Sequence, residues 1–271
     1  MESTIRALFI GDVIGKKGRR LVSVITPALR KEKQIDLVIA NGENAAGGFG
    51  LTKKTADELL SGGVDLLTGG NHTFTKKEVY EIIEEYPIIR PANYPPSVPG
   101  RGYIIKNGLC MISLCGRTFM EPLDCPFRTA DSIINEVSEK TKVIIVDIHA
   151  EATSEKVALG WYLDGRVSAI IGTHTHIPTA DARLLPKGTA YITDVGMVGA
   201  RDSVIGMNKA TILKRFLTQI PERFETAKED GIFCAVILEI DIESGLSLSI
   251  TPIQIEERQS FSNRSGYTSE V

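Results

Sequence analysis

The sequence has few of the features that mark several common classes of protein. It contains 4 cysteines among 271 residues, and no two of them follow a Cys-x-x-Cys spacing, so neither a thiolate zinc site nor a redox dithiol is expected. We expect reduced core and loop thiols in a cytoplasmic protein. No apolar run approaches the roughly 20 residues that cross a bilayer, and the N-terminus lacks a signal-peptide pattern, so no membrane association is expected.

An excess of either charge is also missing. The 31 basic and 34 acidic side chains give a formal net charge of −3, which argues against a general nucleic-acid coat but not against an enzyme acting on single nucleotides. With 42% hydrophobic and 24% charged residues, the chain can bury a sizeable core. Because no linker, repeat or break in composition divides it, we expect one domain over residues 1–255 and a loose, polar tail over 256–271.

Apolar segments typical of buried strands alternate with amphipathic segments typical of helices. We expect strands at residues 7–10, 36–40, 66–68, 143–148, 167–171 and 190–193. We expect helices at residues 18–33, 52–60, 75–86 and 209–218, with Thr52 as the N-cap of the second. Asn107-Gly108 and Ser244-Gly245 mark hairpin turns. The pattern predicts an α/β fold with two central sheets and flanking helices, and the competing prediction is a doubly wound single sheet.

Polar side chains follow successive apolar strands at the point where each strand ends. Because the carboxyl ends of parallel strands meet at one edge, these side chains should share a site. All 4 histidines of the chain belong to this set, whereas a single histidine would be ordinary in a core. The set consists of Asp12, Glu43, Asn44, Asn71, His72, His149, His174 and His176.

The chemistry of these side chains favours metal ions. Oxygen and imidazole donors without thiolates suit manganese, iron, zinc or cobalt. Asp12, Glu43, Asn44, Asn71, His149, His174 and His176 are too many for one catalytic ion, and they fit two ions about 3.5–4 Å apart that share a carboxylate. Two divalent ions outweigh the two carboxylates, which favours an anionic, phosphate-like substrate.

Read in order, these motifs resemble the calcineurin-like metallophosphoesterase superfamily. The matching segments are Gly11-Asp12, Gly42-Glu43-Asn44, Gly70-Asn71-His72, His149 and Gly172-Thr173-His174-Thr175-His176. Ile14 replaces the histidine of the first motif, Glu43 replaces the usual bridging aspartate, and Thr73 stands where an acid is common. With these departures the chain is similar to the bacterial YmdB-like branch, the 2′,3′-cyclic-nucleotide 2′-phosphodiesterases.

The resemblance implies a metallophosphoesterase sandwich of two mixed sheets and a site for two ions, iron or manganese, with zinc as a further option. It implies that Asp12, Glu43, Asn44 and His176 hold one ion. It implies that Glu43, Asn71, His149 and His174 hold the other. It also implies that His72 donates a proton to the leaving oxygen, that the product is a 3′-nucleotide, and that the enzyme is cytoplasmic and oligomeric.

Several alternatives remain open at this point. A phosphomonoesterase, a 3′,5′-cyclic-nucleotide phosphodiesterase and a regulatory metal- or nucleotide-binding protein with incidental activity would all use such a site. An amidohydrolase barrel is disfavoured because its His-x-His pair belongs to the first strand, and here it comes late. The basic segment 16–20 either attracts a phosphate or an RNA end, or forms the solvated start of a helix.

Overall fold

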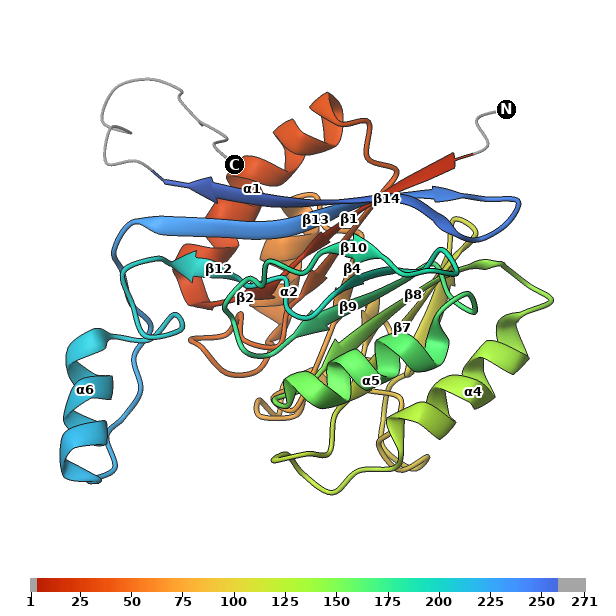
Figure 1. The fold of residues 1–271 in the computed structure, drawn as a ribbon. Helices are drawn as coiled ribbons and strands as arrows, with labels where there is room; N and C mark the ends of the chain where they lie inside the picture. The colour runs from red at the N-terminus through yellow and green to blue at the C-terminus, as the bar shows by residue number, and fades with distance from the viewer. Residues whose placement is uncertain (1–3, 258–271) are drawn as a thin grey trace.

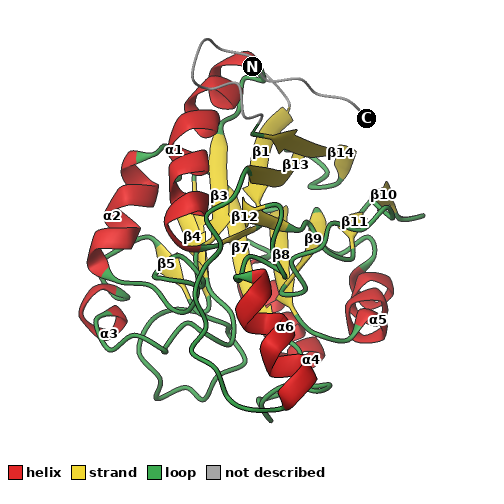
Figure 2. Ribbon diagram, turned by 90° about the vertical axis from the view of Figure 1, so that its left-hand side faces the viewer, coloured by secondary structure: helices red, strands yellow, loops and turns green. Residues whose placement is uncertain are grey.

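The computed structural model describes residues 4–257 and arranges them in four layers, with two β-sheets packed face to face between two layers of helices (Figures 1 and 2). The first sheet runs in the order β2 (Asp12–Val13), β12 (Met197–Ala200), β13 (Gly231–Asp241), β1 (Thr4–Ile10), β3 (Leu37–Asn41), β4 (Leu66–Thr68) and β5 (Ile88–Ile89), with β14 (Ser247–Glu256) also paired to β13. The second runs in the order β10 (Arg183–Leu184), β11 (Ala190–Ile192), β9 (Ala169–Thr173), β8 (Val143–His149), β7 (Leu109–Cys115) and β6 (Tyr103–Lys106).

Both sheets are mixed. Strands β1, β3, β4 and β5 run parallel, as do β7, β8, β9 and β11, whereas β13 and β6 pair with their neighbours in the antiparallel sense. The carboxyl ends of the parallel strands therefore reach a common rim in each sheet. The prediction of two mixed sheets is confirmed, and the alternative of one doubly wound sheet is wrong.

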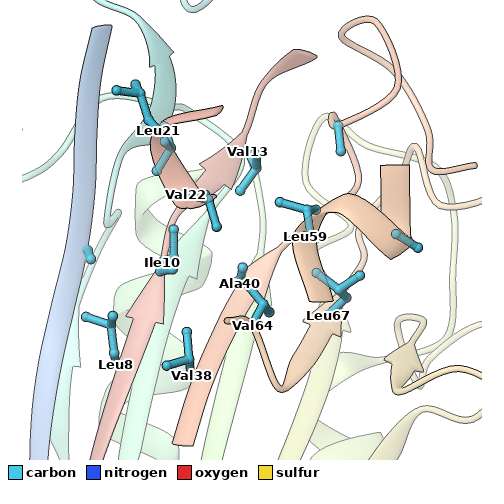
Figure 3. Packing of buried hydrophobic residues seen from close by; sticks show 14 of the residues in the cluster. Leu8, Ile10, Val13, Leu21, Val22, Val38, Ala40, Leu59, Val64 and Leu67 are labelled. Atoms are coloured by element: carbon cyan, nitrogen blue, oxygen red, sulfur yellow. The ribbon is translucent and has the colours of Figure 1, made fainter. Parts of the chain in front are cut away.

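Side chains along the central strands point alternately to the two faces of the sheet, so each strand contributes to two apolar surfaces. In β1, Ala7 and Phe9 face the second sheet, while Leu8 and Ile10 face the helices. Figure 3 shows Leu8 and Ile10 packed beside residues of β3 and the helices. The strands are thus apolar on both faces, which is why they read as continuous hydrophobic runs.

Helices cover the two outer faces. Helices α1 (Gly15–Glu32) and α2 (Lys53–Ser61) pack on the first sheet, and α4 (Pro126–Val137) and α5 (Thr153–Leu163) pack on the second. Thr52 caps α2 through its side chain, as its position before the apolar pattern predicts. Helix α6 (Lys209–Thr218) stands away from both sheets (Figure 1).

The hairpin of β6 and β7 confirms the turn predicted at Asn107-Gly108. Both residues have positive φ values, 51° and 79°, which a two-residue turn of the tightest kind requires. The 4 cysteines are all free, and Cys110, Cys115 and Cys234 are buried, as expected of reduced core thiols.

Some expected boundaries are wrong. The helix predicted over 75–86 is reduced to α3 (Val79–Ile82), because residues 71–76 form turns; in them Thr73 Oγ1 donates to the Gly70 carbonyl. The short strands β2, β5, β10 and β12 have too few residues to show a pattern.

The first two residues of the predicted tail are among the described residues. Strand β14 includes Glu256, and Glu257 accepts a hydrogen bond from Lys17, so both residues belong to the folded part. The rest of the predicted tail, from residue 258, lies outside the described residues, and the domain boundary at 255 stays a prediction. Across residues 4–257, no helix combines the length and apolar character needed to span a bilayer.

The layer between the sheets generates a stability prediction. Phe9 is fully buried there, so Phe9→Ala should lower the free energy of unfolding by about 3–5 kcal/mol. Urea denaturation followed by circular dichroism measures the change. Val24→Ala, on the outer side of α1 where the side chain is 49% exposed, is the control and should change it by less than about 0.5 kcal/mol. A loss below about 1 kcal/mol for Phe9→Ala would contradict this packing.

Candidate metal centre

The polar side chains predicted from the strand ends lie together where the rims of the two sheets meet. Asp12 belongs to β2, and Glu43 and Asn44 follow β3. Asn71 and His72 follow β4. From the other sheet, His149 ends β8, and His174 and His176 follow β9. Both sheets therefore contribute donors to one site.

One group of donors surrounds the Nε2 atom of His149. This atom lies 2.9 Å from Glu43 Oε1, 3.0 Å from Asn71 Oδ1 and 3.0 Å from His174 Nδ1. Ligand atoms of Glu43, His149 and His174 all lie within 4.8 Å of one another, which is the spacing of atoms that share one ion. Four donors from four segments thus converge on one point.

A second group also includes Glu43. His176 Nε2 is 3.6 Å from Asp12 Oδ1 and 3.3 Å from Asn44 Nδ2, and Asn44 Nδ2 is 3.3 Å from Glu43 Oε1. Asp12 is completely buried, yet its Oδ1 atom has no hydrogen-bond partner among residues 4–257. A buried carboxylate oxygen without a donor is costly, and a cation beside it would satisfy it. The donor set and this unpaired oxygen fit a metal ion.

The three imidazoles of these groups are oriented by hydrogen bonds at their other nitrogen. His174 Nε2 lies 3.0 Å from Glu151 Oε2, and His176 Nδ1 lies 2.9 Å from the Ile205 carbonyl. His149 Nδ1 lies 2.9 Å from Thr173 Oγ1, whose hydroxyl donates to Asp147. Each ring can therefore donate a proton outward and turn a lone pair toward the site, as metal-ligating histidines do.

Asp147 was missed by the sequence analysis. It is fully buried, and its two oxygens accept hydrogen bonds from Thr68 at 2.5 Å and Thr173 at 2.7 Å, and from the Asn41 amide at 3.3 Å. It lies two residues before His149 on β8 and so faces the same layer. A charged residue inside an otherwise apolar strand was the signal that could have identified it.

The electrostatics of the site follow from burying several ionisable groups together. Burial disfavours a charged imidazole, but Glu43, Asp12 and Asp147 together raise the pKa of His149 to about 9. Burial alone would raise the pKa of Glu43, yet His149 and the backbone N–H of His72 lower it to about 2. Burial raises the pKa of Asp147 to about 6. The carboxylates thus favour a positive charge at His149, either a proton on the ring or a metal ion bound to it.

His174 and Asp12 have pKa values displaced in the directions that burial favours. Burial and the neighbouring His149 lower the pKa of His174 to about 3. Burial raises the pKa of Asp12, although His176 and His149 oppose the change. A neutral His174 keeps the lone pair that a metal ligand requires.

The loop that carries His174 and His176 is held in an unusual conformation. Their φ values are 98° and 67°, a region that residues other than glycine rarely adopt. Buried Lys156 stabilises it by donating to the Thr173 carbonyl at 2.6 Å and pairing with Asp194 at 2.8 Å. Asp194 follows β11, so the same strand-end rule could have identified it.

A glycine allows the loop after β4 to approach the donors. A Cβ atom on Gly70 would lie 2.3 Å from His149 Cδ2 and 2.4 Å from Glu43 Oε2, so a side chain there would displace both ligand candidates. Two residues later, the His72 backbone N–H donates to Glu43 Oε2 at 2.9 Å.

His72 differs from the other three histidines. Its ring is half-buried, contacts Thr75 and Phe49, and takes no part in the two donor groups. It lines a cavity of about 570 Å³ together with Glu43, Asn44, His174 and His176. The position suits a group that exchanges a proton with a molecule in the cavity.

Two further residues near the site have different roles. Ile14 occupies core space beneath Gly199 and Gly206, so it supplies nothing to the donors. Glu151 contacts the ring of His174.

The basic residues at the start of α1 are partly committed to internal contacts. Arg19 binds the Ala45 carbonyl and Glu58, and Lys17 binds Glu257. These two side chains therefore stabilise the fold, whereas Lys16 and Arg20 of the segment 16–20 are exposed.

Comparisons with known proteins match the chain to one family over most of its length. The family model of the YmdB-like proteins matches residues 8–253. The chain is 49% identical over 262 residues to a protein of Bacillus subtilis strain 168 named 2′,3′-cyclic-nucleotide 2′-phosphodiesterase, covering 95% of this chain and 99% of that protein. It is 37% identical over 269 residues to a putative phosphatase/phosphodiesterase of Mycoplasma pneumoniae, covering 95% of each chain.

Solved structures agree in fold. A hypothetical protein from Thermus thermophilus superimposes with a TM-score of 0.87 at 48% identity, covering 94% of this chain and 100% of that one. A crystal structure described as a novel phosphatase from Mycoplasma pneumoniae gives a TM-score of 0.89 at 36% identity, covering 98% of both chains. The prediction of a metallophosphoesterase sandwich is confirmed. The match over most of the chain shows that it belongs to the YmdB-like family.

Proposed function

We propose that the chain is a two-metal phosphodiesterase that hydrolyses 2′,3′-cyclic nucleotides to 3′-nucleotides. The observation that carries the proposal is that seven donors converge in two groups joined by Glu43, beside a cavity that His72 also lines. The name of the Bacillus subtilis relative, 49% identical over most of both chains, supports the substrate class. Relatives named phosphatase or phosphodiesterase support the same kind of hydrolysis.

We assign the donors to two ions. The first would be held by Asp12, Glu43, Asn44 and His176, and the second by Glu43, Asn71, His149 and His174. The distances within each group and the unpaired Asp12 oxygen support this division. Asn44 compensates for Ile14, which cannot act as a ligand.

Such a pair of ions supplies, when bound, Lewis acidity toward a phosphoryl group and an activated water. The protein's part is to bind and orient the ester so that its phosphorus faces the donors. His72 then holds a proton for the departing 2′ oxygen, a role that its place in the cavity and outside the donor groups supports. The hydrogen bond from the His72 backbone N–H to Glu43 fixes the distance between this proton donor and the metal site.

We propose iron or manganese as the ions. Carboxylate, amide and imidazole donors without thiolate suit both metals. Zinc also binds such donors and is the further option. Reconstitution with each metal, followed by elemental analysis, distinguishes them.

A phosphomonoesterase is the second candidate, because one structural relative is described as a phosphatase. A 3′,5′-cyclic-nucleotide phosphodiesterase, or a regulatory nucleotide-binding protein with incidental activity, would use the same donors.

The deciding experiment offers 2′,3′-cyclic and 3′,5′-cyclic nucleotides, linear diesters and monoesters to the metal-loaded protein. We expect multiple turnover on the 2′,3′-cyclic nucleotide with a 3′-phosphate product. A 2′-phosphate product, or monoesters as better substrates, would contradict the proposal. RNA ends carrying a 2′,3′-cyclic phosphate present the same reacting group and belong in the panel.

Glu43→Gln tests whether this residue joins two ions. The amide keeps the shape of the side chain but loses the charge between the two groups, so metal content should fall from two ions per chain to one or fewer. Elemental analysis after dialysis against metal-free buffer measures it. Glu239→Gln, at a partly exposed ion pair with Arg6, is the matched control and should retain both ions. Full metal content in Glu43→Gln would refute the bridging role.

His72→Ala separates proton donation from metal binding. Turnover should fall by about 10²–10⁴-fold, because general-acid assistance is lost, while metal content stays at the wild-type value. Initial rates and elemental analysis on the same preparation check both expectations. Loss of metal in this variant would identify His72 as a ligand.

We also propose that the protein forms a homo-oligomer. Helix α6 exposes Leu213, Phe216 and Leu217, with Leu217 84% exposed, and an apolar surface of this kind favours association. Sedimentation velocity should show an oligomer for the wild type and smaller species for Leu217→Ser. A wild-type monomer at micromolar concentration would contradict the proposal.

The four free cysteines support a reducing compartment, and we propose the cytoplasm.

A further inference from the structure

The cavity beside the metal centre has two chemically different ends. One end is formed by the donor groups and His72, where a phosphate would react. The other end lies under α6 and is lined mainly by apolar and aromatic side chains. These are Phe49, Val204, Ile205, Met207, Ile212, Phe216 and Phe224. The phosphate end is therefore continuous with an apolar pocket.

Aromatic rings lead from the reacting end into this pocket. The ring of Phe49 lies 4.9 Å from that of His72 in an edge-to-face arrangement. Phe49 also lies 6.0 Å from Phe224, with the two ring planes inclined by only 28°. The guanidinium of Arg215 lies over Phe224 at 4.7 Å from the ring centroid. The aromatic rings and the guanidinium thus form one connected surface.

The fold holds these groups in place from three segments. Phe49 belongs to the glycine-rich loop after β3, where Gly48 has a φ of 100° and a Cβ atom there would lie 2.7 Å from Met207. The segment carrying Phe224 returns to the start of α6, since Asn208 N–H donates to the Glu225 carbonyl at 2.8 Å. His176 bonds to the Ile205 carbonyl at 2.9 Å, which couples the pocket wall directly to a metal-ligand candidate.

We infer that this pocket binds the nucleobase of the substrate by stacking on Phe49, Phe224 and Arg215. Aromatic rings and guanidinium planes are the surfaces on which proteins stack single bases. A ribose cyclic phosphate has one other bulky group, the base, and the pocket begins beside His72 where the ribose oxygen would leave. A cavity of about 570 Å³ is in the range of pockets that hold small ligands.

The inference deepens the proposed function, because it names what holds the non-reacting part of the substrate. Binding energy from such a remote group assists catalysis on the complete substrate. The expected consequence is that a cyclic phosphate lacking a base is a much poorer substrate than a cyclic nucleotide.

The kinetic test compares a 2′,3′-cyclic nucleotide with methyl riboside 2′,3′-cyclic phosphate, which has no base. For the metal-loaded wild type, kcat/KM should be about 10- to 100-fold higher for the nucleotide, and Phe224→Ala and Arg215→Ala should each reduce this ratio. Phe224→Leu keeps apolar volume without an aromatic face and should also reduce it. Trp161→Leu, which removes a partly exposed ring under Arg183 outside the cavity, is the matched control and should keep the wild-type ratio.

A binding measurement makes the result independent of turnover. Calorimetry with the metal-loaded protein compares a nucleoside 3′-monophosphate with ribose 3-phosphate. The nucleotide should bind about 10- to 100-fold more tightly in the wild type and in Trp161→Leu, and this difference should shrink in Phe224→Ala. If neither cyclic ester is hydrolysed but this difference depends on Phe224, the proposed function fails and the base site stands. If both esters are hydrolysed equally well and both phosphates bind equally, the base site is wrong while the phosphodiesterase activity remains. Thermal melts of each variant confirm folding.

Discussion

The carboxylate of Glu43 is the contact on which the arrangement of the site depends. Its Oε1 atom lies 2.9 Å from His149 and 3.3 Å from Asn44, so it belongs to both donor groups, and its Oε2 atom accepts the His72 backbone N–H. Two segments that are far apart in the sequence, at His72 and His149, are thereby tied to the segment that carries Glu43. A buried carboxylate among imidazoles is stable only when positive charge lies beside it, which is the property a metal site requires.

The same strands build the core and support the site. Between the sheets, alternate residues are apolar over most of each strand and become polar near its carboxyl end, as with Leu37, Ile39 and then Asn41 on β3. Asp147 follows the same sequence on β8 and orients His149 through Thr173. The rigidity of the packed layers therefore extends to the donors, which need fixed positions to select an ion and its geometry.

The architecture and the convergence of the polar side chains could be predicted because both follow from simple periodicity. Continuous apolar strands that end in polar residues indicate parallel strands with a common rim, and all seven proposed donors lie at that rim. Asp147 was not predicted because it lies inside an otherwise apolar strand. Most of the helix expected over 75–86 is replaced by turns, which are stabilised by side-chain hydrogen bonds such as that of Thr73. The pocket under α6 could not be predicted, since Phe49, Arg215 and Phe224 come together only through tertiary contacts.

The central claim is that side chains between positions 12 and 176 hold a pair of ions. Anomalous X-ray scattering from crystals of the manganese-loaded protein tests it most directly, because each ion gives its own peak. The account predicts two peaks on either side of the Glu43 carboxylate, one beside Asp12 and His176 and the other beside His149 and His174. A single peak, or peaks away from Glu43, would contradict it.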